Sequence, residues 1–392
     1  MRFPEFHGEW EKCKLGELAV KVGSGSTPKG GNAVYTTSGH YFVRSQNVGM
    51  GHLILNDIAY IDELTHQKQK STELRTNDVL LNITGASIGR TALATEEING
   101  GNVNQHVCII RTNGNVEPSF ICDYIQTSKI QKYIQSLQTG GSREGLNFEQ
   151  IRSFPINIPT VEEQVKIAKL LSLINERIAT QSKLIEDLKK LKSAIIDYAI
   201  NSLDTDFAKF SSLYEMAGEG GTPTTSNASF YDNGKIPFVK IDDLKKKYLT
   251  ENKDFITELG LQKSSAWLVP TRSILFSNGA TIGEITITTY PVCTKQGILG
   301  IVPKPNIDVE FLYYFMSSSY FRKAVSRIVT EGTMKTAYLK DINNIRCPIP
   351  KKEKQLDIAK MPSALNFKID FEQSILKLFG SQKQYLLRQM FM

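Results

Sequence analysis

Polar side chains able to form paired hydrogen bonds gather in short loops at two places along the chain. Asn and Gln can bond an adenine edge at two positions, and Arg does the same for guanine. Ser, Thr and loop backbone amides suit phosphate oxygens. The candidate DNA-contacting residues are Lys29, Arg44, Gln46, Asn47, Thr84, Ser87, Arg90, Asn104, Gln105, Ser142 and Arg143, and then Lys240, Asp242, Asn278, Thr281, Lys295, Gln296, Thr333 and Lys335. The alternative is that these loops are only turns, and for Gly85, Gly89, Gly279 and Gly283 that is the better interpretation.

No catalytic or metal motif accompanies these side chains. The sequence lacks a GxxxxGK[ST] phosphate loop, GxSxG and HExxH. It also lacks a Gly-rich S-adenosylmethionine turn and an Asn/Asp-Pro-Pro-aromatic tetrapeptide. His106 and Cys108 come nearest to a metal pair, but two ligands are too few for zinc. We therefore expect no catalytic residue, no metal site and no cofactor.

Composition and charge predict a cytoplasmic protein. The chain of 392 residues has a formal net charge of +7, and residues 351–392 hold eight basic against four acidic residues. Net charge alone therefore does not indicate nucleic-acid binding. The five cysteines are scattered, which is typical of reduced thiols. The start has no apolar signal-peptide core, and no apolar run is long enough for a membrane span.

An internal repeat organises the chain. The matched pairs, in the same order in both halves, are "GSGSTP" (23–28) with "GEGGTP" (218–223), "YFVRS" (41–45) with "PFVKI" (237–241), "LLNITGASIGR" (80–90) with "ILFSNGATIGE" (274–284), "VNQH" (103–106) with "TKQG" (294–297), and "INIPTVEEQVKIAK" (156–169) with "CPIPKKEKQLDIAK" (347–360). Repeats of about 190 residues indicate a duplicated domain, because solenoid repeats have periods of about 20–50 residues.

Each copy consists of a globular domain followed by a long helix. Residues 1–160 and 204–350 carry short apolar runs separated by Gly, Asn, Ser and Thr, which predicts strands, with one or two helices at 118–137 and at 309–328. Residues 161–203 contain no Gly or Pro and predict a long helix, and 351–392 predict its counterpart. Pro362 should kink or delay that second helix. The fold class is therefore α+β, with a pseudo-two-fold internal repeat.

A heptad rhythm runs along both long helices. The apolar positions expected to pair the helices are Leu171, Ile174, Ile178, Ile185, Leu188, Ile195, Leu365, Ile369, Leu376, Phe379 and Leu386. Such a seam packs against another helix. We expect the two helices to form an antiparallel coiled coil; the alternative is that each lies on its own domain as an ordinary amphipathic helix. A helix of 43 residues is about 65 Å long, which would hold two readers one or more duplex turns apart.

The whole chain resembles the specificity subunit of a Type I restriction–modification system. The resemblance rests on the order of domain then helix, on "LGELAVKVGSGSTPKGG", "LLNITGASIGR", "NQHVCIIR" and "GGSREGLNFEQI", and on "IPTVEEQVKIAKLL" at the helix entry. It implies that 1–160 and 204–350 are target recognition domains, each reading one half of a bipartite site in double-stranded DNA. "FSNGATIGEITI" and "EGTMKTAY" in the second domain depart most from the family pattern.

The resemblance also implies partners and a division of labour. The paired helices would dock two methyltransferase subunits that bring S-adenosylmethionine, and restriction subunits would add translocation and nuclease activity. This chain would have no catalysis of its own and no membrane partner. Two other classes stay open on the sequence: a free-standing methyltransferase or nuclease, and a coiled-coil scaffold that does not read DNA.

Overall fold

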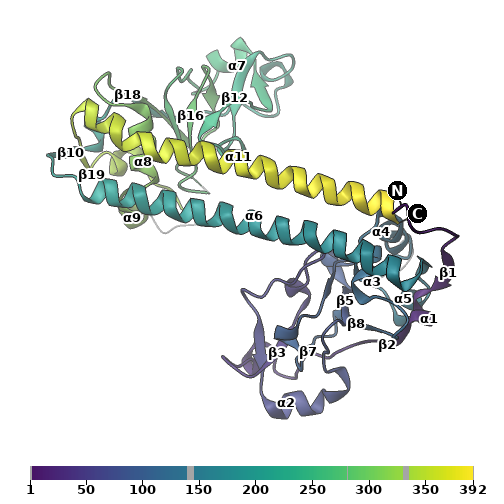
Figure 1. The fold of residues 1–392 in the computed structure, drawn as a ribbon. Coiled ribbons are helices and arrows are strands. Elements are labelled where there is room, and N and C mark those ends of the chain that lie inside the picture. The colour runs from purple at the N-terminus through teal and green to yellow at the C-terminus, as the bar shows by residue number, and fades with distance from the viewer. Residues whose placement is uncertain (1, 139–144, 280, 330–334, 392) are drawn as a thin grey trace. The chain divides into compact units, whose positions relative to one another are not determined.

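The computed structural model describes residues 2–138, 145–279, 281–329 and 335–391, and these fall into two units. Unit 1 comprises Met1–Ser182 with Ser374–Met392, and unit 2 comprises Lys183–Gln373. Each unit therefore takes one globular domain and a part of each long helix. In Figure 1 unit 1 contains the purple and blue elements and unit 2 the green ones.

Unit 1 contains a mixed α/β domain built on two small sheets and a separate antiparallel pair of strands. Its strands and helices are β1 (Glu11–Lys14), α1 (Leu15–Leu18), β2 (Ala19–Ser24), β3 (His40–Val43), β4 (Ala59–Ile61), α2 (Glu63–Lys68), β5 (Val79–Asn82), β6 (Thr91–Leu93), β7 (Asn102–Val103), β8 (Val107–Thr112), α3 (Pro118–Ile125), α4 (Ser128–Ser136), α5 (Phe148–Arg152) and β9 (Pro155–Ile158). The strand orders are β2-β8-β5-β6, β4-β3-β7 and β1-β9.

Unit 2 repeats this plan. Its elements are β10 (Phe207–Lys209), β11 (Tyr214–Glu219), β12 (Ile236–Val239), β13 (Tyr248–Leu249), β14 (Asp254–Ile256), α7 (Glu258–Gln262), β15 (Ile274–Ser277), β16 (Ile285–Thr288), β17 (Cys293–Thr294), β18 (Ile298–Pro303), α8 (Val309–Ser317), α9 (Ser319–Ile328), α10 (Leu339–Ile342) and β19 (Arg346–Pro348). The strand orders are β11-β18-β15-β16-β13, β14-β12-β17 and β10-β19.

Strand register shows that the two domains are copies of one structure. In the first, Val79 on β5 lies opposite Ile110 on β8. In the second, Ile274 on β15 lies opposite Ile301 on β18. The central strands are buried along their whole length because a second layer covers each face. On one face of the first domain the helices supply Phe120 and Tyr124.

The long helices are α6 (Val161–Asn201) and α11 (Lys352–Met390). In unit 1, Leu171 and Ile174 near the start of α6 share one apolar cluster with Leu386 and Met390 near the end of α11. In unit 2, Lys192 Nζ donates a 2.9 Å hydrogen bond to Asn366 Oδ1, which joins the later part of α6 to the earlier part of α11. The helices are therefore antiparallel, and the predicted fold class is confirmed.

All eleven positions proposed for helix pairing are buried or half-buried. The helices also pack on their own domains, because Ile167 and Ala168 lie in the unit 1 core and Ile358 and Ala359 in the unit 2 core. Each helix thus uses one face for its partner helix and another for its domain.

Pro362 lies inside α11, so the predicted delay of that helix is wrong. A proline removes one backbone donor from the helix interior and costs about 3 kcal/mol. Packing on both sides of Pro362 offsets this cost: Ile358 and Ala359 are buried before it, and Ser363 Oγ donates a 2.6 Å hydrogen bond to Glu310 Oε2 after it.

A buried glutamine fastens the start of each long helix to its own domain. Gln164 Oε1 accepts from Glu117 N at 2.9 Å and its Nε2 donates to Pro159 O at 2.9 Å. Gln355 Oε1 accepts from Asp308 N at 2.8 Å and its Nε2 donates to Pro350 O at 2.9 Å. Both glutamines are 1% exposed. Each one ties the loop before the long helix to the cap of the helix after β8 or β18.

A second polar anchor joins α11 to the domain of unit 1. Lys383 Nζ on α11 donates to Gln126 Oε1 at 2.9 Å, and Gln126 Nε2 donates to Asp123 Oδ1 at 3.0 Å. Burial raises the pKa of Asp123 to about 7 and lowers that of Lys383. The cluster fixes the end of α11 on α3 at the cost of two buried ionisable groups.

No helix in the described ranges combines the length and the apolar character needed to cross a membrane.

The glutamine anchors yield a stability prediction. Gln164→Met keeps the side-chain length but leaves Glu117 N and Pro159 O without a partner, so we expect a loss of about 1–3 kcal/mol in the free energy of unfolding. Gln384→Met, on the exposed side of α11, should change it by less than about 0.5 kcal/mol. Denaturant unfolding measures both variants, and equal midpoints for the two would contradict the anchoring role.

Candidate nucleic-acid interface

The GxGxTP motif builds one corner of each domain. A Cβ on Gly25 would overlap the carbonyl oxygen of Val103, and one on Gly220 would overlap that of Thr294. Only glycine lets the two segments approach this closely. The threonine that follows then reaches the glutamine of the second segment. Thr27 Oγ1 donates to Gln105 Oε1, and Thr222 Oγ1 accepts from Gln296 N at 3.3 Å.

The loop after the central strand forms the next part of this edge in unit 1. Asn82 Nδ2 donates to Ser45 O at 2.8 Å and to Ser87 Oγ at 3.1 Å, which holds the loop on the β3 side. Thr84 Oγ1 lies 2.6 Å from His106 Nδ1, and Gln105 Nε2 lies 3.0 Å from His106 Nε2. Two groups of linked polar side chains, Asn82 with Ser87 and Thr84 with His106 and Gln105, therefore lie in the segments that form this edge.

Backbone hydrogen bonds match residues of the two domains one to one. Asn104 N donates to Val43 O in the first copy, and Lys295 N donates to Val239 O in the second. Asn47 N donates to Arg44 O, as Asp243 N does to Lys240 O. Arg44 is thus the counterpart of Lys240, Gln46 of Asp242, Asn104 of Lys295, and Gln105 of Gln296.

Three candidates among the described residues are buried and serve the scaffold. Asn47 is 1% exposed, and its Oδ1 accepts from Arg44 N at 3.0 Å. Asn104 is 7% exposed and its Oδ1 accepts from His106 N at 3.1 Å. Asn278 is 1% exposed and donates to Ala337 O at 3.3 Å. We leave these three out of the proposed reading surface because their side chains are turned inward.

Ion pairs and hydrogen bonds to acidic residues occupy the side chains of some of the remaining candidates. Arg44 Nη2 donates to Asp57 O at 2.8 Å and lies over the Tyr35 ring, with 19% of its side chain exposed. Gln46 Nε2 donates to Asp57 Oδ2 at 2.7 Å. Lys240 Nζ pairs with Asp254 Oδ1 at 2.8 Å. These contacts hold the side chains in fixed positions beside the edge.

Among the candidate residues that the structure describes, the exposed cations without an ion pair are Lys29, Arg90, Lys295 and Lys335. Such groups can contact phosphates or guanine without breaking an existing pair. Ser142, Arg143 and Thr333 lie outside the described residues.

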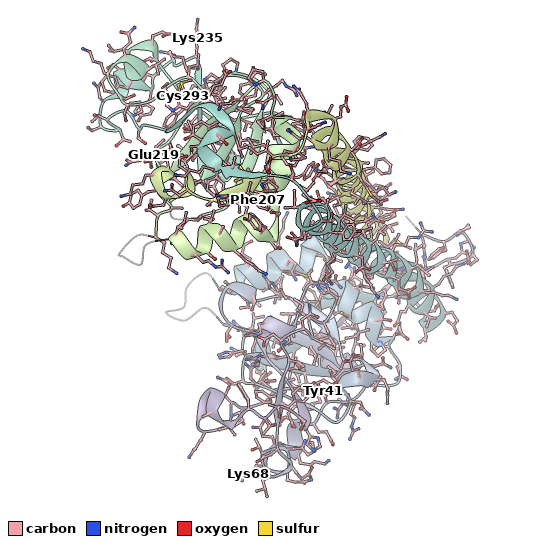
Figure 2. All side chains as sticks on the ribbon, turned by 90° about the vertical axis from the view of Figure 1, so that its left-hand side faces the viewer. Tyr41, Lys68, Phe207, Glu219, Lys235 and Cys293 are labelled. Atoms are coloured by element: carbon pink, nitrogen blue, oxygen red, sulfur yellow. The ribbon has the colours of Figure 1, made fainter. Side chains whose placement is uncertain are left out.

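In unit 2 the matched segments converge on a groove of about 680 Å³. Five predicted residues line it, namely Lys240, Asp242, Thr281, Lys295 and Gln296. Sequence reasoning missed further polar lining residues: Glu219, labelled in Figure 2, Thr222, Thr336 and Tyr338. The signal for the first two was available, because both lie in the repeated GEGGTP motif. Lys335 lies apart from this groove and lines a separate hollow beside Phe276 and Phe321.

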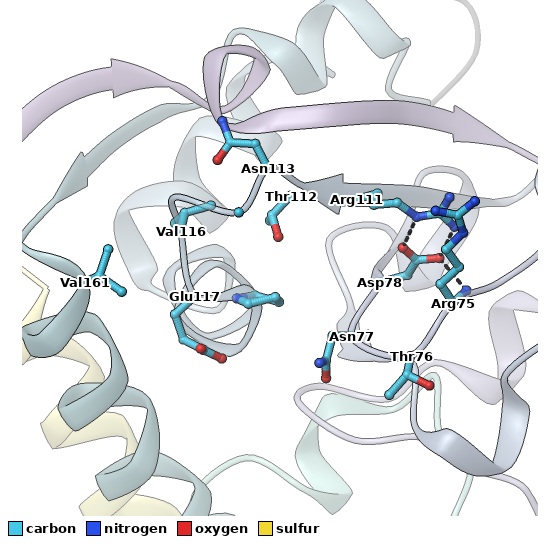
Figure 3. A pocket seen from close by; sticks show the side chains of 12 residues that line it. Arg75, Thr76, Asn77, Asp78, Arg111, Thr112, Asn113, Val116, Glu117 and Val161 are labelled. Atoms are coloured by element: carbon cyan, nitrogen blue, oxygen red, sulfur yellow. Dashed lines mark hydrogen bonds and ion pairs between the residues drawn. The ribbon is translucent and has the colours of Figure 1, made fainter.

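Another hollow in unit 1 lies where β5 begins, at the end opposite the Thr84 loop (Figure 3). Asp78 is 1% exposed and pairs with Arg111 through two contacts of 2.7 Å. Asp78 Oδ2 also accepts from Arg75 N at 2.8 Å. This buried pair is fully used in joining β5 to β8, so we assign it a structural role.

The thiols do not form a reactive centre. All five cysteines are free, and burial raises the pKa of Cys108 and Cys122 to about 12. They therefore stay protonated at neutral pH and are poor nucleophiles. Within the described ranges no group of three His, Cys, Asp or Glu side chains could hold a metal ion.

Comparison with known proteins gives the family. The family model "Type I restriction modification DNA specificity domain" matches residues 7–190 and again 205–378. The chain therefore belongs to this family and carries its domain twice. It is a DNA-recognising specificity subunit of the Type I restriction–modification class with two target recognition domains, and the scaffold alternative is not supported.

Relatives and solved structures agree along the full length. The Type I restriction enzyme MjaIX specificity subunit of Methanocaldococcus jannaschii is 22% identical, covering 97% of this chain and 90% of its own length. The HindI specificity subunit of Haemophilus influenzae is 19% identical, covering 83% and 86%. A crystal structure of a Type I system S subunit from M. genitalium shares the fold, with a TM-score of 0.58 at 15% identity and coverage of 100% and 99%. A chain of a type I R-M system structure gives 0.60 at 16%, covering 99% and 98%.

The GxGxTP corner gives a matched pair of variants. Gly25→Ala forces the β2 loop away from Val103 and should lower the melting temperature by several degrees, because backbone atoms cannot move aside cheaply. Gly23→Ala places a methyl group where no atom lies within 4 Å and should leave the melting temperature nearly unchanged. Thermal unfolding of both proteins measures this, and an equal loss in both would show that the close approach is not the reason for the motif.

Proposed function

We propose that each domain of this chain reads one half of a bipartite DNA site, and that the long antiparallel helices set the gap between the halves. The observation that carries the proposal is the one-to-one match of backbone hydrogen bonds at the polar edge of the two domains, combined with different side chains at the matched positions. One scaffold with two sets of polar groups suits the reading of two different short sequences.

The exposed members of the predicted set form the proposed reading surface. In the first domain they are Lys29, Gln46, Arg90 and Gln105, with Arg44, Thr84 and Ser87 half-buried beside them. In the second domain they are Asp242, Thr281, Lys295, Gln296 and Lys335, with Lys240 half-buried beside them. Ser142, Arg143 and Thr333 remain predicted contacts. Charged side chains such as those of Lys29 and Arg90 suit phosphates, whereas amide side chains such as that of Gln105 suit base edges.

We assign the chemistry to partner subunits. In this proposal the chain is not an enzyme: two methyltransferase subunits that bind S-adenosylmethionine dock on the paired helices, and restriction subunits join that core. The domain boundaries are those expected from the sequence, 1–160, 161–203, 204–350 and 351–392. The complex acts on DNA in the cytoplasm.

Exposed apolar side chains on the helices support the docking part of the proposal. On α11, Phe371, Leu378 and Tyr385 recur at intervals of seven residues and are each 45–67% exposed. On α6, Leu184, Leu191 and Tyr198 recur at the same interval and are 40–77% exposed. Rows of exposed apolar side chains on a protein of this class suit the binding of another protein.

The test is to express the chain with the methyltransferase encoded beside it in a host free of DNA methylation, and to map methylated adenines by long-read sequencing. A split motif with two specified halves around a fixed gap is the expected result. A chimera carrying residues 204–350 of a relative should then change one half alone. A continuous motif, or a chimera that changes both halves, would contradict the proposal.

A further inference from the structure

Charged side chains of both signs line the unit 2 groove, and at two of their positions the matched residue of unit 1 is uncharged. The groove is lined by the acids Glu219 and Asp242 and by the cations Lys240 and Lys295. At the positions that match Asp242 and Lys295, the first domain has Gln46 and Asn104, and Asn104 is buried. The second domain therefore carries two opposite charges where the first has two uncharged amides.

Existing contacts occupy two of the four charged groups. Glu219 Oε1 accepts a 2.9 Å hydrogen bond from Gly297 N, which fixes it on the wall of the groove. Lys240 Nζ is held by Asp254 at 2.8 Å. These two side chains shape the groove, and Asp242 and Lys295 are left to meet a ligand.

Asp242 and Lys295 are both available for recognition. The side chain of Asp242 is 87% exposed, and its one ion pair among the described residues is with Lys245 at 3.7 Å, whose side chain is 73% exposed. Exposed pairs of this kind contribute little stability and exchange readily. Lys295 is exposed, and no ion pair of its side chain is found within the described residues. Its backbone N donates to Val239 O at 2.9 Å, beside the strand end that leads into the turn carrying Asp242.

The chemistry of this pair matches one kind of base pair. A carboxylate only accepts hydrogen bonds, and in the major groove it suits the N4 amino group of cytosine. An ammonium only donates, and it suits O6 and N7 of guanine. An A·T pair also offers one amino group, but neither of its bases has two neighbouring acceptors like O6 and N7 of guanine. Together, one carboxylate and one ammonium complement the two edges of a single C·G pair.

We propose that Asp242 and Lys295 determine specificity for a C·G pair in the half-site read by the second domain. This inference rests on the proposed function. Asp242 accepts from cytosine N4, and Lys295 donates to guanine O6 and N7. The first domain has no charged residue at either matched position, so it does not read a C·G pair in this way.

The experiment uses the complex of the full chain with its methyltransferase partner. The wild-type motif is mapped first, and methylation rates are then compared between the matched duplex and a duplex with A·T at the C·G pair. Lys295→Met should reduce the discrimination between these duplexes by roughly tenfold to a hundredfold. Asp242→Asn should shift the preference toward A·T, because Asn bonds adenine at two positions. The other half of the motif should stay unchanged in both variants.

Two controls separate readout from stability and from phosphate contact. Lys245 pairs with Asp242 but does not line the groove. Lys245→Met should therefore leave the motif as in the wild type. A duplex with 7-deazaguanine at the C·G pair should slow the wild-type complex and leave the Lys295→Met complex unaffected, because only N7 is lost. A uniform loss of affinity on all sequences would identify Lys295 as a phosphate contact and overturn the assignment.

The outcomes also distinguish this inference from the function on which it rests. If the wild-type motif is split but Lys295→Met does not relax the specificity at any C·G pair in it, the inference is wrong and the proposed function stands. If the wild-type complex gives no split motif, both are wrong.

Discussion

Two buried glutamines, Gln164 and Gln355, are the contacts on which the arrangement of each copy depends. Each one accepts from the backbone N–H of the N-cap residue of a domain helix and donates to the carbonyl of the proline that lies two residues before a long helix. A buried polar group left without a partner costs about 1–3 kcal/mol. Orientations of the long helix that break these bonds are therefore disfavoured. A reading edge can be held at a set place relative to a helix only if this junction is rigid. The identical bonds in both copies explain why the "IPxxxxQ" segment is repeated.

Positions shared by the two domains build the edge, and positions that differ give it chemistry. Glycines 25 and 220 permit close approach of two segments, and the following threonines bind the glutamine of the second segment in both copies. Side chains on the same frame then differ: Gln46 against Asp242, and buried Asn104 against exposed Lys295. This division suits a protein whose partners stay the same while its target varies, since the scaffold and the readers change independently.

Periodicity and repetition predicted most of the fold, because they report on burial. The heptad positions, the helix pairs after β8 and β18, and the duplicated order of domain and helix all follow from apolar spacing. The reading residues were harder to predict. Asn47, Asn104 and Asn278 have the right chemistry but are turned inward, and no local pattern tells an amide that caps a turn from one that faces DNA. Thr222 and Glu219 were missed because their motif was used only as evidence for the repeat. Pro362 does not delay α11, because packing lets the helix continue through it, and a kink at this proline stays a prediction.

The claim that the paired helices set the gap between two half-sites is the most direct one to test. Seven residues inserted after Ser182 and seven after Gln373 keep the heptad register of both helices and lengthen each by about 10 Å. Methylation mapping of the resulting complex should show both half-sites unchanged and a gap longer by about three base pairs, given a rise of about 3.4 Å per base pair. An unchanged gap, or altered half-sites, would contradict the account.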